Sequence, residues 1–264
     1  MSKRKNLTGE YSGRGDPQVT LSLLWGEPSA PKRGRKPSLT IGAIGKAAMA
    51  IADAGGLDTL SMRALSEALG VSTMALYRYV PGKPELLDLI IDRAYAELPQ
   101  DPAPGESWER RIERVARDEW ELYLAHPWML SISSYRAALG PSGLRKYERE
   151  LQAIADTGLD DPGMDLLVTS LSSFVRGAAR FAHEGRTAPK QTGKTDAEWW
   201  QANAQVLEKL VRPDDFPLAS RVGSTVGQAA ESAAHPVRAF EFGLRCFIQG
   251  IRTPDTSFRQ APNR

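Results

Sequence analysis

The chain has 264 residues, which is enough for two domains with cores of their own. Its 34 Lys and Arg residues nearly balance its 32 Asp and Glu residues, so the net charge of +2 does not by itself indicate a nucleic-acid partner. A single cysteine, Cys246, excludes an internal disulfide and is typical of a reducing compartment, and no apolar run is long enough to span a membrane, so we expect a cytoplasmic protein without a membrane partner.

Basic residues crowd the first 40 positions, and we expect residues 1–38 to form a flexible basic arm. The apolar island Val19–Trp25 within this arm can form a short helix that packs on the body, but the sequence does not give its position there. Arg33 and Arg35 flank Gly34 between lysines and prolines, a pattern that resembles the AT-hook type of arm, whose arginines enter a narrow minor groove. The alternative is a solvated basic linker.

The stretch Leu57–Lys83 predicts two short helices joined by a tight turn. Ser61 and Ser72 stand where the two helices need N-caps, and Gly70 can take the left-handed conformation that ends the first helix. Six apolar residues fall on inward-facing positions: Leu60, Leu65, Leu69, Val71, Leu76 and Val80. Five residues are left facing out: Thr73, Met74, Ala75, Tyr77 and Arg78. Such a helix-turn-helix is suited to a DNA major groove, and the alternative is an ordinary helical hairpin.

Helical spacing of apolar residues predicts helices over most of the remaining chain. The predicted helices cover residues 41–54, 84–98, 108–125, 128–139, 141–158, 164–184, about 199–210 and 236–251. Residues 185–196 and 212–234 are predicted loops, and no segment has the alternating pattern of a strand. We therefore expect an all-α protein in which a three-helix helix-turn-helix domain precedes a larger helical domain.

Residues 39–98 resemble the DNA-binding domain of the tetracycline-repressor (TetR) family of bacterial regulators. The resemblance rests on the spacing of glycines, aromatics and lysine in these segments: Ala54-Gly55-Gly56-Leu57, Leu60-Ser61-Met62-Arg63-Ala64-Leu65, Leu69-Gly70-Val71-Ser72, Leu76-Tyr77-Arg78-Tyr79-Val80 and Lys83-Pro84-Glu85-Leu86-Leu87. A looser similarity to the family's C-terminal domains rests on Ser134-Tyr135-Arg136 and Phe240-Glu241-Phe242-Gly243-Leu244. The resemblance implies a homodimeric repressor that a small molecule releases from its operator. It also implies a DNA-binding domain over residues 39–85 and an effector-binding and dimerisation domain over residues 86–264.

The resemblance assigns the DNA-binding roles residue by residue. Thr73, Met74 and Ala75 match the first turn that reads bases, and Arg63 matches a base-reading position on the preceding helix. Tyr77, Tyr79 and Lys83 match phosphate contacts, although core aromatics are the alternative for the two tyrosines. The expected DNA-binding set is Met62, Arg63, Thr73, Met74, Ala75, Tyr77, Tyr79 and Lys83, with Arg33 and Arg35 from the arm.

The residues expected to bind the effector differ from those of the tetracycline repressor itself. That protein holds a magnesium-bound drug with a loop histidine, whereas Arg136–Gly140 here has none. We therefore expect a small hydrophobic or aromatic effector and no metal or other cofactor. The expected pocket residues are Trp120, Tyr123, Trp128, Tyr135, Phe174 and Arg180, and ordinary core is the alternative for each aromatic.

Two predicted helices, Met164–Glu184 and Pro236–Ile251, carry apolar stripes with small residues that permit close approach, so four helices from two subunits can form a dimer interface. The expected interface residues are Leu171, Phe174, Gly177, Phe240, Leu244 and Phe247. A two-fold dimer requires a palindromic operator. The alternative function is a ligand-independent dimeric DNA-binding protein.

No catalytic group or metal site can be assembled from this sequence. The three histidines lack metal-ligand spacing. Residues 188–195 fit a permissive phosphate-loop pattern with alanine in place of the first glycine, but such a loop needs a preceding strand, so a solvated loop is the better interpretation. We therefore expect no enzyme activity.

Overall fold

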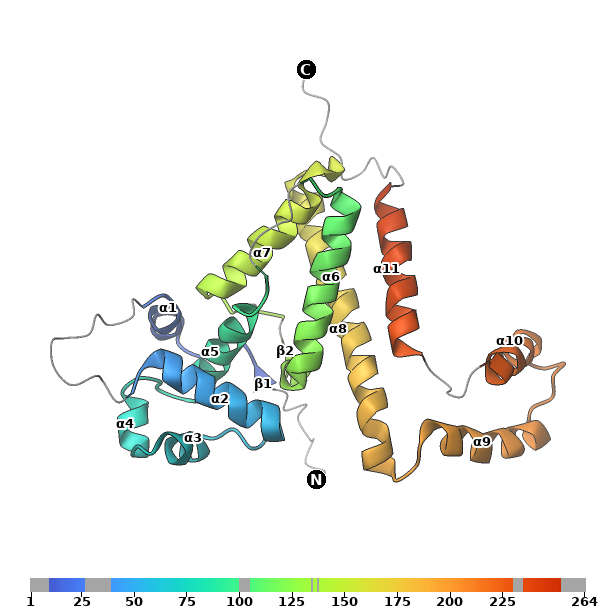
Figure 1. Ribbon diagram of the computed structural model, residues 1–264, viewed down its shortest axis with the longest axis horizontal. Helices are drawn as coiled ribbons and strands as arrows, with labels where there is room; N and C mark the ends of the chain where they lie inside the picture. Colours follow the sequence, from blue (N-terminus) through green and yellow to red (C-terminus); the bar gives the residue numbers. More distant parts are fainter. Residues whose placement is uncertain are drawn as a thin grey trace, which may run out of the picture. The chain divides into compact units, whose positions relative to one another are not determined.

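The computed structural model describes residues 10–26, 39–99, 105–133, 135–136, 138–229 and 235–252. These residues are almost entirely helical, which confirms the predicted all-α class (Figure 1). The chain forms two compact units, one from Met1–Arg176 with Phe247–Arg264 and the other from Gly177–Cys246. The predicted domain boundary at residue 85 falls inside a helix of the first unit, and the division into two functional domains stays a prediction. No helix among the described ranges is long and apolar enough to cross a membrane.

The first unit contains α1 to α7 and the start of α8. Their bounds are α1 Pro17–Trp25, α2 Ile41–Gly55, α3 Met62–Leu69, α4 Thr73–Tyr77, α5 Lys83–Tyr95, α6 Trp108–Ala125, α7 Pro141–Ile154 and α8 Asp161–Thr192. Two 3-10 helices, η1 (Pro127–Ser131) and η2 (Ala155–Thr157), two short strands, β1 (Glu10–Tyr11) and β2 (Ile132–Ser133), and the end of α11 (Pro236–Arg252) from Phe247 complete it.

The capping residues predicted for α3 and α4 are confirmed. Ser61 Oγ accepts a hydrogen bond from Ala64 N at 3.1 Å, and Ser72 Oγ accepts one from Ala75 N at 3.2 Å. Thr40 caps α2 in the same way. Gly70 ends α3 with φ of 65°, a conformation that L side chains adopt only with strain. These local signals fix the turn between α3 and α4.

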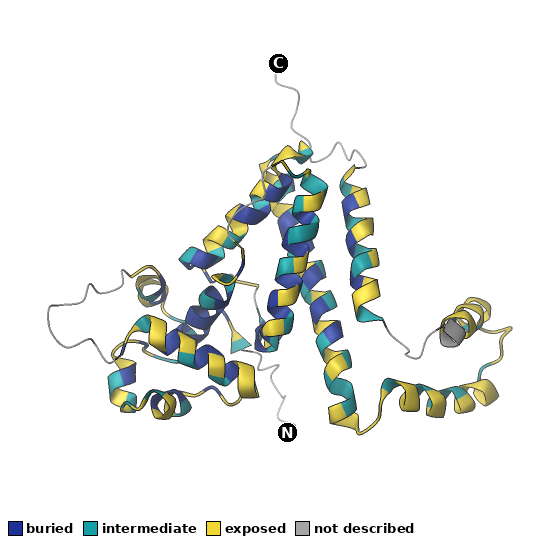
Figure 2. Ribbon diagram, viewed as in Figure 1, coloured by how far each residue is buried: buried dark blue, intermediate teal, exposed yellow. Residues whose placement is uncertain are grey.

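Helix α5 is the central helix of the first unit. Nine of its residues are buried, all round the helix: Glu85, Leu86, Leu87, Asp88, Leu89, Ile90, Ile91, Asp92 and Ala94 (Figure 2). It packs against α1, α2 and α7. The sequence predicted its apolar stripe but not its three buried carboxylates, which need partners from elsewhere in the chain.

The N-terminal residues from 10 to 26 correct two expectations. They were predicted as part of a flexible arm in which Val19–Trp25 can form a short helix. That helix is present as α1 and packs on α5, and the strand β1 precedes it. β1 pairs in parallel with β2, with Glu10 opposite Ile132, although no strand was predicted. Of the helix predicted over residues 128–139, the described residues show the 3-10 helix η1 at its start, after which the chain forms β2. Pairing between residues more than 120 positions apart leaves no local pattern to detect.

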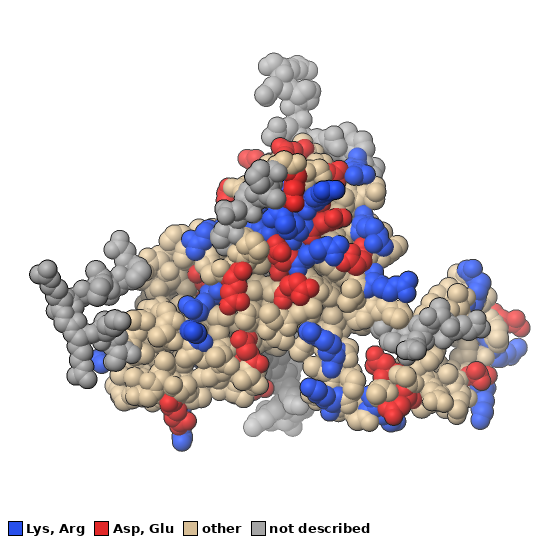
Figure 3. Space-filling view, in the orientation of Figure 1, with Lys and Arg blue, Asp and Glu red and all other residues tan. Residues whose placement is uncertain are grey.

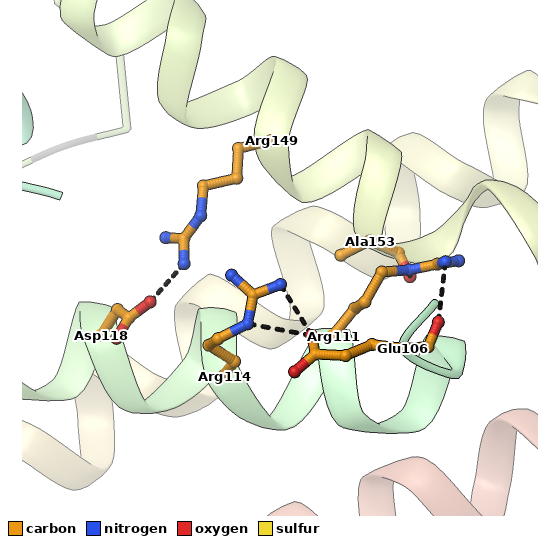
Figure 4. Close-up of polar contacts among 6 residues, drawn as sticks. All are labelled: Glu106, Arg111, Arg114, Asp118, Arg149 and Ala153. Carbon is orange, nitrogen blue, oxygen red and sulfur yellow. Dashed lines mark hydrogen bonds and ion pairs between the residues drawn. The ribbon is translucent and has the colours of Figure 1, made fainter. Parts of the chain in front are cut away.

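Ion pairs join α6 to α7 and to the chain that flanks them. Basic and acidic side chains lie interspersed over these two helices (Figure 3). Arg149 of α7 pairs with Asp118 of α6, and Arg114 pairs with Glu106 at 2.9 Å (Figure 4). Arg111 donates to the carbonyls of Ala153 and Glu106 at 3.3 and 3.2 Å. These contacts hold α6 and α7 in a fixed register.

The second unit contains the end of α8, then α9 Asp196–Leu210, α10 Pro217–Ala229 and most of α11 Pro236–Arg252. The loop predicted at residues 185–196 was wrong for most of its length. Helix α8 continues past Pro189 to Thr192, although a proline removes one backbone donor and crowds the preceding turn, and Gly193 with φ of 69° follows the helix. The loop predicted at 212–234 was also wrong, since Pro217 begins α10. No residue of α9 is buried.

Candidate DNA-binding surface and effector cavity

The outer face of α3 and α4 presents most of the side chains predicted to contact DNA. Met74 is 76% exposed, and Tyr77 and Tyr79 are 43% and 37% exposed, so the two tyrosines are not core aromatics. Thr73 and Ala75 are half-buried, and Thr73 Oγ1 lies 3.2 Å from Ser66 Oγ. The buried core behind this face includes Leu60, Leu65, Leu76 and Val80, as predicted, whereas Leu69 and Val71 are half-buried.

Met62 is the exception in the predicted DNA-binding set. Its side chain is only 9% exposed and belongs to the core of the helix-turn-helix, because it occupies the first position of α3 on the inward face. Arg33 and Arg35 lie outside the described residues.

The two cations of the set that lie among the described residues, Arg63 and Lys83, are each held by a carboxylate. Arg63 Nε lies 2.9 Å from Glu67 Oε1 in an exposed pair on α3. Lys83, the first residue of α5, lies 2.8 Å from Glu10 Oε1 and donates to the Leu57 carbonyl at 3.3 Å. An exposed ion pair of this kind is weak, so either cation can exchange its carboxylate for a DNA phosphate or base.

A cavity of about 490 Å³ lies within the first unit. Residues of α5, α6, α7, α8 and the segment after β2 line it, and these include Tyr95, Tyr123, Tyr135, Lys146, Tyr147 and Arg176. Of the six predicted pocket residues, Tyr123 and Tyr135 are in this lining. The volume falls in the range of small-molecule sites.

The other four predicted pocket residues are engaged elsewhere. Trp120 is a core residue at 4% exposure, and Trp128 Nε1 donates to Asp53 Oδ1 at 2.7 Å. The Phe174 ring stacks on Phe247 with centroids 6.3 Å apart. Arg180 is exposed and pairs with Glu184 at 2.9 Å. Apolar periodicity cannot separate a cavity-lining aromatic from a core aromatic, since both face inward.

A buried network of charges, which the sequence pattern did not predict, forms one wall of the cavity. Lys146 Nζ lies 3.1 Å from Glu119 Oε1 and 2.5 Å from Glu150 Oε1. Tyr123 OH donates to Glu119 at 3.1 Å, and Ser172 Oγ donates to Glu119 and Glu150 at 3.3 and 3.2 Å. The four-residue spacings of Lys146 with Glu150 and of Glu119 with Tyr123 are local signals, but they are identical to those of surface pairs.

The network holds Lys146 charged despite its burial. Burial lowers the pKa of Lys146, but Glu119 and Glu150 outweigh it and raise that pKa well above its ordinary value. Burial raises the pKa of Glu150, and Lys146 opposes that rise. Burial also raises the pKa of Tyr95, and burial with Glu119 raises that of Tyr123 well above its ordinary range, so both phenols stay neutral.

Arg176 supports the neighbouring wall. It donates to the carbonyls of Met129, at 2.8 Å, and Ile132, and its guanidinium lies 5.6 Å from the centre of the Tyr123 ring. Lys146 and Arg176 balance the charges of Glu119 and Glu150. The cavity therefore offers aromatic faces, hydroxyl groups and a charge-balanced polar wall.

Helix α5 connects the cavity to the helix-turn-helix. It begins at Lys83, and farther along it supplies Ile91 and Tyr95 to the cavity lining. Asp92 Oδ1 accepts hydrogen bonds from Ser142 N and Gly143 N, at 2.9 and 2.8 Å, and so caps the start of α7. A Cβ at Gly140 would lie 2.2 Å from Asp92 Oδ1, so this close approach requires glycine.

His126 joins α2 to the segment after α5. Its Nδ1 lies 2.7 Å from Asp53 Oδ1 and its Nε2 lies 3.0 Å from Glu97 Oε2. Burial lowers the pKa of His126, but the hydrogen bonds to Asp53 and Glu97 outweigh it and raise that pKa above its ordinary value.

We predict a pH dependence of stability from His126. Because the pKa of His126 is raised in the folded state, its protonation stabilises the folded protein. This contribution to the free energy of unfolding is fully present below the unfolded pKa of about 6.5 and is lost as pH rises through the folded pKa. Urea unfolding from about pH 6 to 8.5 should therefore show a falling free energy of unfolding, and His126→Gln should flatten that dependence. His183→Gln on α8 is the matched control, and an equal flattening there would contradict the assignment.

The predicted dimer residues divide between core and surface. Leu171, Phe240 and Leu244 are at most 3% exposed in the single chain, so they do not need a partner subunit to bury them. Phe174 and Phe247 are half-buried and stack on each other, and Gly177 is exposed.

Among the described ranges, no group of three His, Cys, Asp or Glu residues is arranged to hold a metal ion.

Comparisons with known proteins cover both parts of the chain. Residues 44–90 match the family described as bacterial regulatory proteins, tetR family, and residues 101–254 match the tetracyclin repressor-like C-terminal domain. The HTH-type transcriptional repressor DrrR1 of Streptomyces coeruleorubidus is 41% identical over 245 residues, which are 92% of this chain and 88% of that protein.

Solved structures of ActR are also similar to this chain. Apo ActR from Streptomyces coelicolor is similar with a TM-score of 0.67 and 28% identity, covering 82% of this chain and 96% of that one. The complex of ActR, a TetR family protein, with actinorhodin gives a TM-score of 0.67 and 30% identity over 81% and 95% of the two chains. Since the matches extend from the helix-turn-helix through the helices that enclose the cavity, the chain belongs to the TetR family of bacterial transcriptional regulators.

Proposed function

We propose that this protein is a repressor that binds a two-fold symmetric operator as a homodimer and releases it when a flat aromatic molecule enters the cavity. Helix α5 carries the proposal, because it begins beside the helix-turn-helix and places Ile91 and Tyr95 in the cavity lining. A ligand that favours one position of α5 changes the spacing of the recognition helices, and so couples cavity and DNA.

The chemistry of the cavity supports a neutral, polycyclic aromatic effector that carries hydroxyl and carbonyl groups. Tyr95, Tyr123 and Tyr147 offer ring faces or edges, and Lys146, Ser172 and Arg176 lie among the lining as hydrogen-bonding groups. The balanced charges of the network do not call for a strongly charged ligand. Actinorhodin, with which the similar protein ActR forms a complex of known structure, serves as the first probe.

The test begins with an operator selected from random duplex DNA and examined for two-fold symmetry. The DNA complex is then titrated with actinorhodin and, separately, with neutral polycyclic aromatics that carry hydroxyl and carbonyl groups. Thr169→Trp fills part of the cavity, and Ser170→Trp is its matched control, because Ser170 is an exposed neighbour outside the lining. We expect the Thr169 variant to bind DNA but to resist release, and the Ser170 variant to behave like the parent. If the compounds release both variants from DNA to the same extent, the cavity is not the effector site. If none of the compounds releases the parent protein from DNA or shifts its melting temperature, ligand-independent DNA binding is favoured.

Arg63 provides a separate prediction for the DNA surface. Its fork can reach guanine O6 and N7 once it leaves Glu67, so Arg63→Ala should relax base preference at one operator position on the order of ten-fold. Selection of binding sites by the variant measures this change. Glu148→Ala on the outer face of α7 is the control, and an unchanged preference in the Arg63 variant would place the contact surface elsewhere.

A further inference from the structure

The segment Glu10–Trp25, which we name the N-terminal strap, lies against both functional parts of the first unit. At one end Glu10 Oε1 is 2.8 Å from Lys83 Nζ, beside the helix-turn-helix. Two residues later, Ser12 is part of the cavity lining. At the other end Trp25 Nε1 donates to the carbonyl of Leu139, which also lines the cavity, at 2.8 Å. The strap therefore joins the predicted phosphate contact to the cavity wall.

Several anchors fix the position of Glu10. Its strand pairs with β2, and Ser12 N donates to Ser133 O at 3.2 Å. Ser12 Oγ and Gly13 N donate to the Asp88 carboxylate of α5 at 2.8 and 3.0 Å. Burial raises the pKa of Asp88, whose charge these two donors stabilise. Because its neighbours on the strand are tied to β2 and α5, the Glu10 carboxylate is held close to Lys83 rather than sampling solvent.

We propose that Glu10 is an internal substitute for an operator phosphate, which occupies Lys83 in the free protein and must leave it before DNA binds there. Both side chains remain about one-third exposed, at 34% for Lys83 and 36% for Glu10, so a phosphate can reach the ammonium group. A carboxylate and a phosphate are both anions that accept from the same ammonium, so they compete for it. The inference rests on the proposed function, since it takes Lys83 to be a phosphate contact.

The strap also gives the cavity a route to Lys83. Tyr135, Ala138 and Leu139 line the cavity just after β2, and β2 holds β1. A ligand that favours the paired arrangement of β1 and β2 keeps Glu10 on Lys83 and weakens DNA binding. A ligand bound in the cavity and the ion pair between Glu10 and Lys83 therefore favour each other.

The test compares Glu10→Gln, Lys83→Gln and the double variant, each as the full chain, on the selected operator and on a scrambled duplex of equal length. Glu10→Gln is expected to bind both duplexes about two- to five-fold more tightly than the parent, which is the range of an exposed ion pair. Lys83→Gln is expected to bind both more weakly, with a salt slope shallower by about one. In the double variant, Glu10→Gln should not increase the affinity for DNA, because the Lys83 ammonium that Glu10 occupies is absent.

Glu148→Gln controls for the loss of one negative charge, since Glu148 is exposed on α7. The inference is overturned if Glu148→Gln gains as much affinity as Glu10→Gln, or if Glu10→Gln gains equally with and without Lys83. It is also overturned if Glu10→Gln binds like the parent while Lys83→Gln is weakened. A parent protein that binds no duplex would instead overturn the proposed function, and the inference with it.

Discussion

Lys146→Met should lower the free energy of unfolding by about 3–5 kcal/mol at pH 7. Lys146 lies between Glu119 and Glu150, and its removal leaves two buried carboxylates without their cation. An uncompensated buried charge costs far more than the net value of the intact pair, because the ion has lost its water and gains no partner. Chemical denaturation of parent and variant, with the slope against denaturant compared as well as the midpoint, measures the loss.

The loss of unfolding free energy in Lys146→Met should become smaller as the pH falls. Burial already raises the pKa of Glu150 in the parent, and without Lys146 that pKa rises further. A carboxyl group whose pKa is raised on folding stabilises the folded state below its unfolded pKa, and that contribution is lost as pH rises through the folded pKa. The variant therefore recovers stability relative to the parent between about pH 7 and pH 4.5.

A compensated variant separates charge from packing. Glu119→Gln and Glu150→Gln combined with Lys146→Met remove all three charges while nearly preserving volume, and this triple variant should regain much of the lost stability. A loss below about 1 kcal/mol in Lys146→Met, or a triple variant no better than the single one, would show that the network is solvated rather than buried.

The helix-turn-helix could be predicted because its signals are local. Ser61, Gly70 and Ser72 cap and turn the chain through contacts within a few residues, and the apolar spacing that buries Leu65 and Leu76 repeats within the same segment. The outward position of Met74 followed from the same spacing. Where a structure is specified within ten residues, the sequence pattern is sufficient.

The cavity wall could not be predicted, because its partners are distant in sequence. Lys146 and Glu150 have the spacing of a surface pair, and only the approach of Glu119 from α6 and Ser172 from α8 makes them a buried network. The same holds for Asp88, whose partners come from residues 12 and 13, about 75 positions away. Burial of a charge depends on which helix covers it, and helical periodicity does not carry that information.

Leu76→Ala and Met74→Ala should separate the fold of the recognition helix from its contact with DNA. Leu76 is fully buried behind α4, and its truncation should lower the free energy of unfolding by about 2–5 kcal/mol, with loss of DNA binding as the small domain unfolds. Met74, two residues earlier, is 76% exposed, so Met74→Ala should leave stability within about 0.5 kcal/mol of the parent. Thermal and urea unfolding of the two variants provide the first measurement.

Binding-site selection provides the second measurement. Met74 has no hydrogen-bonding group for base readout, but it can press on a thymine methyl, so Met74→Ala should weaken the preference for thymine at one operator position. If Met74→Ala destabilises the protein as much as Leu76→Ala, the side chain belongs to the core and the outward face of α4 has been misplaced. If Met74→Ala changes neither stability nor base preference, sequence reading falls to Thr73, Arg63 and their neighbours, and α4 serves mainly to place α3 and the Lys83 ammonium against the phosphates.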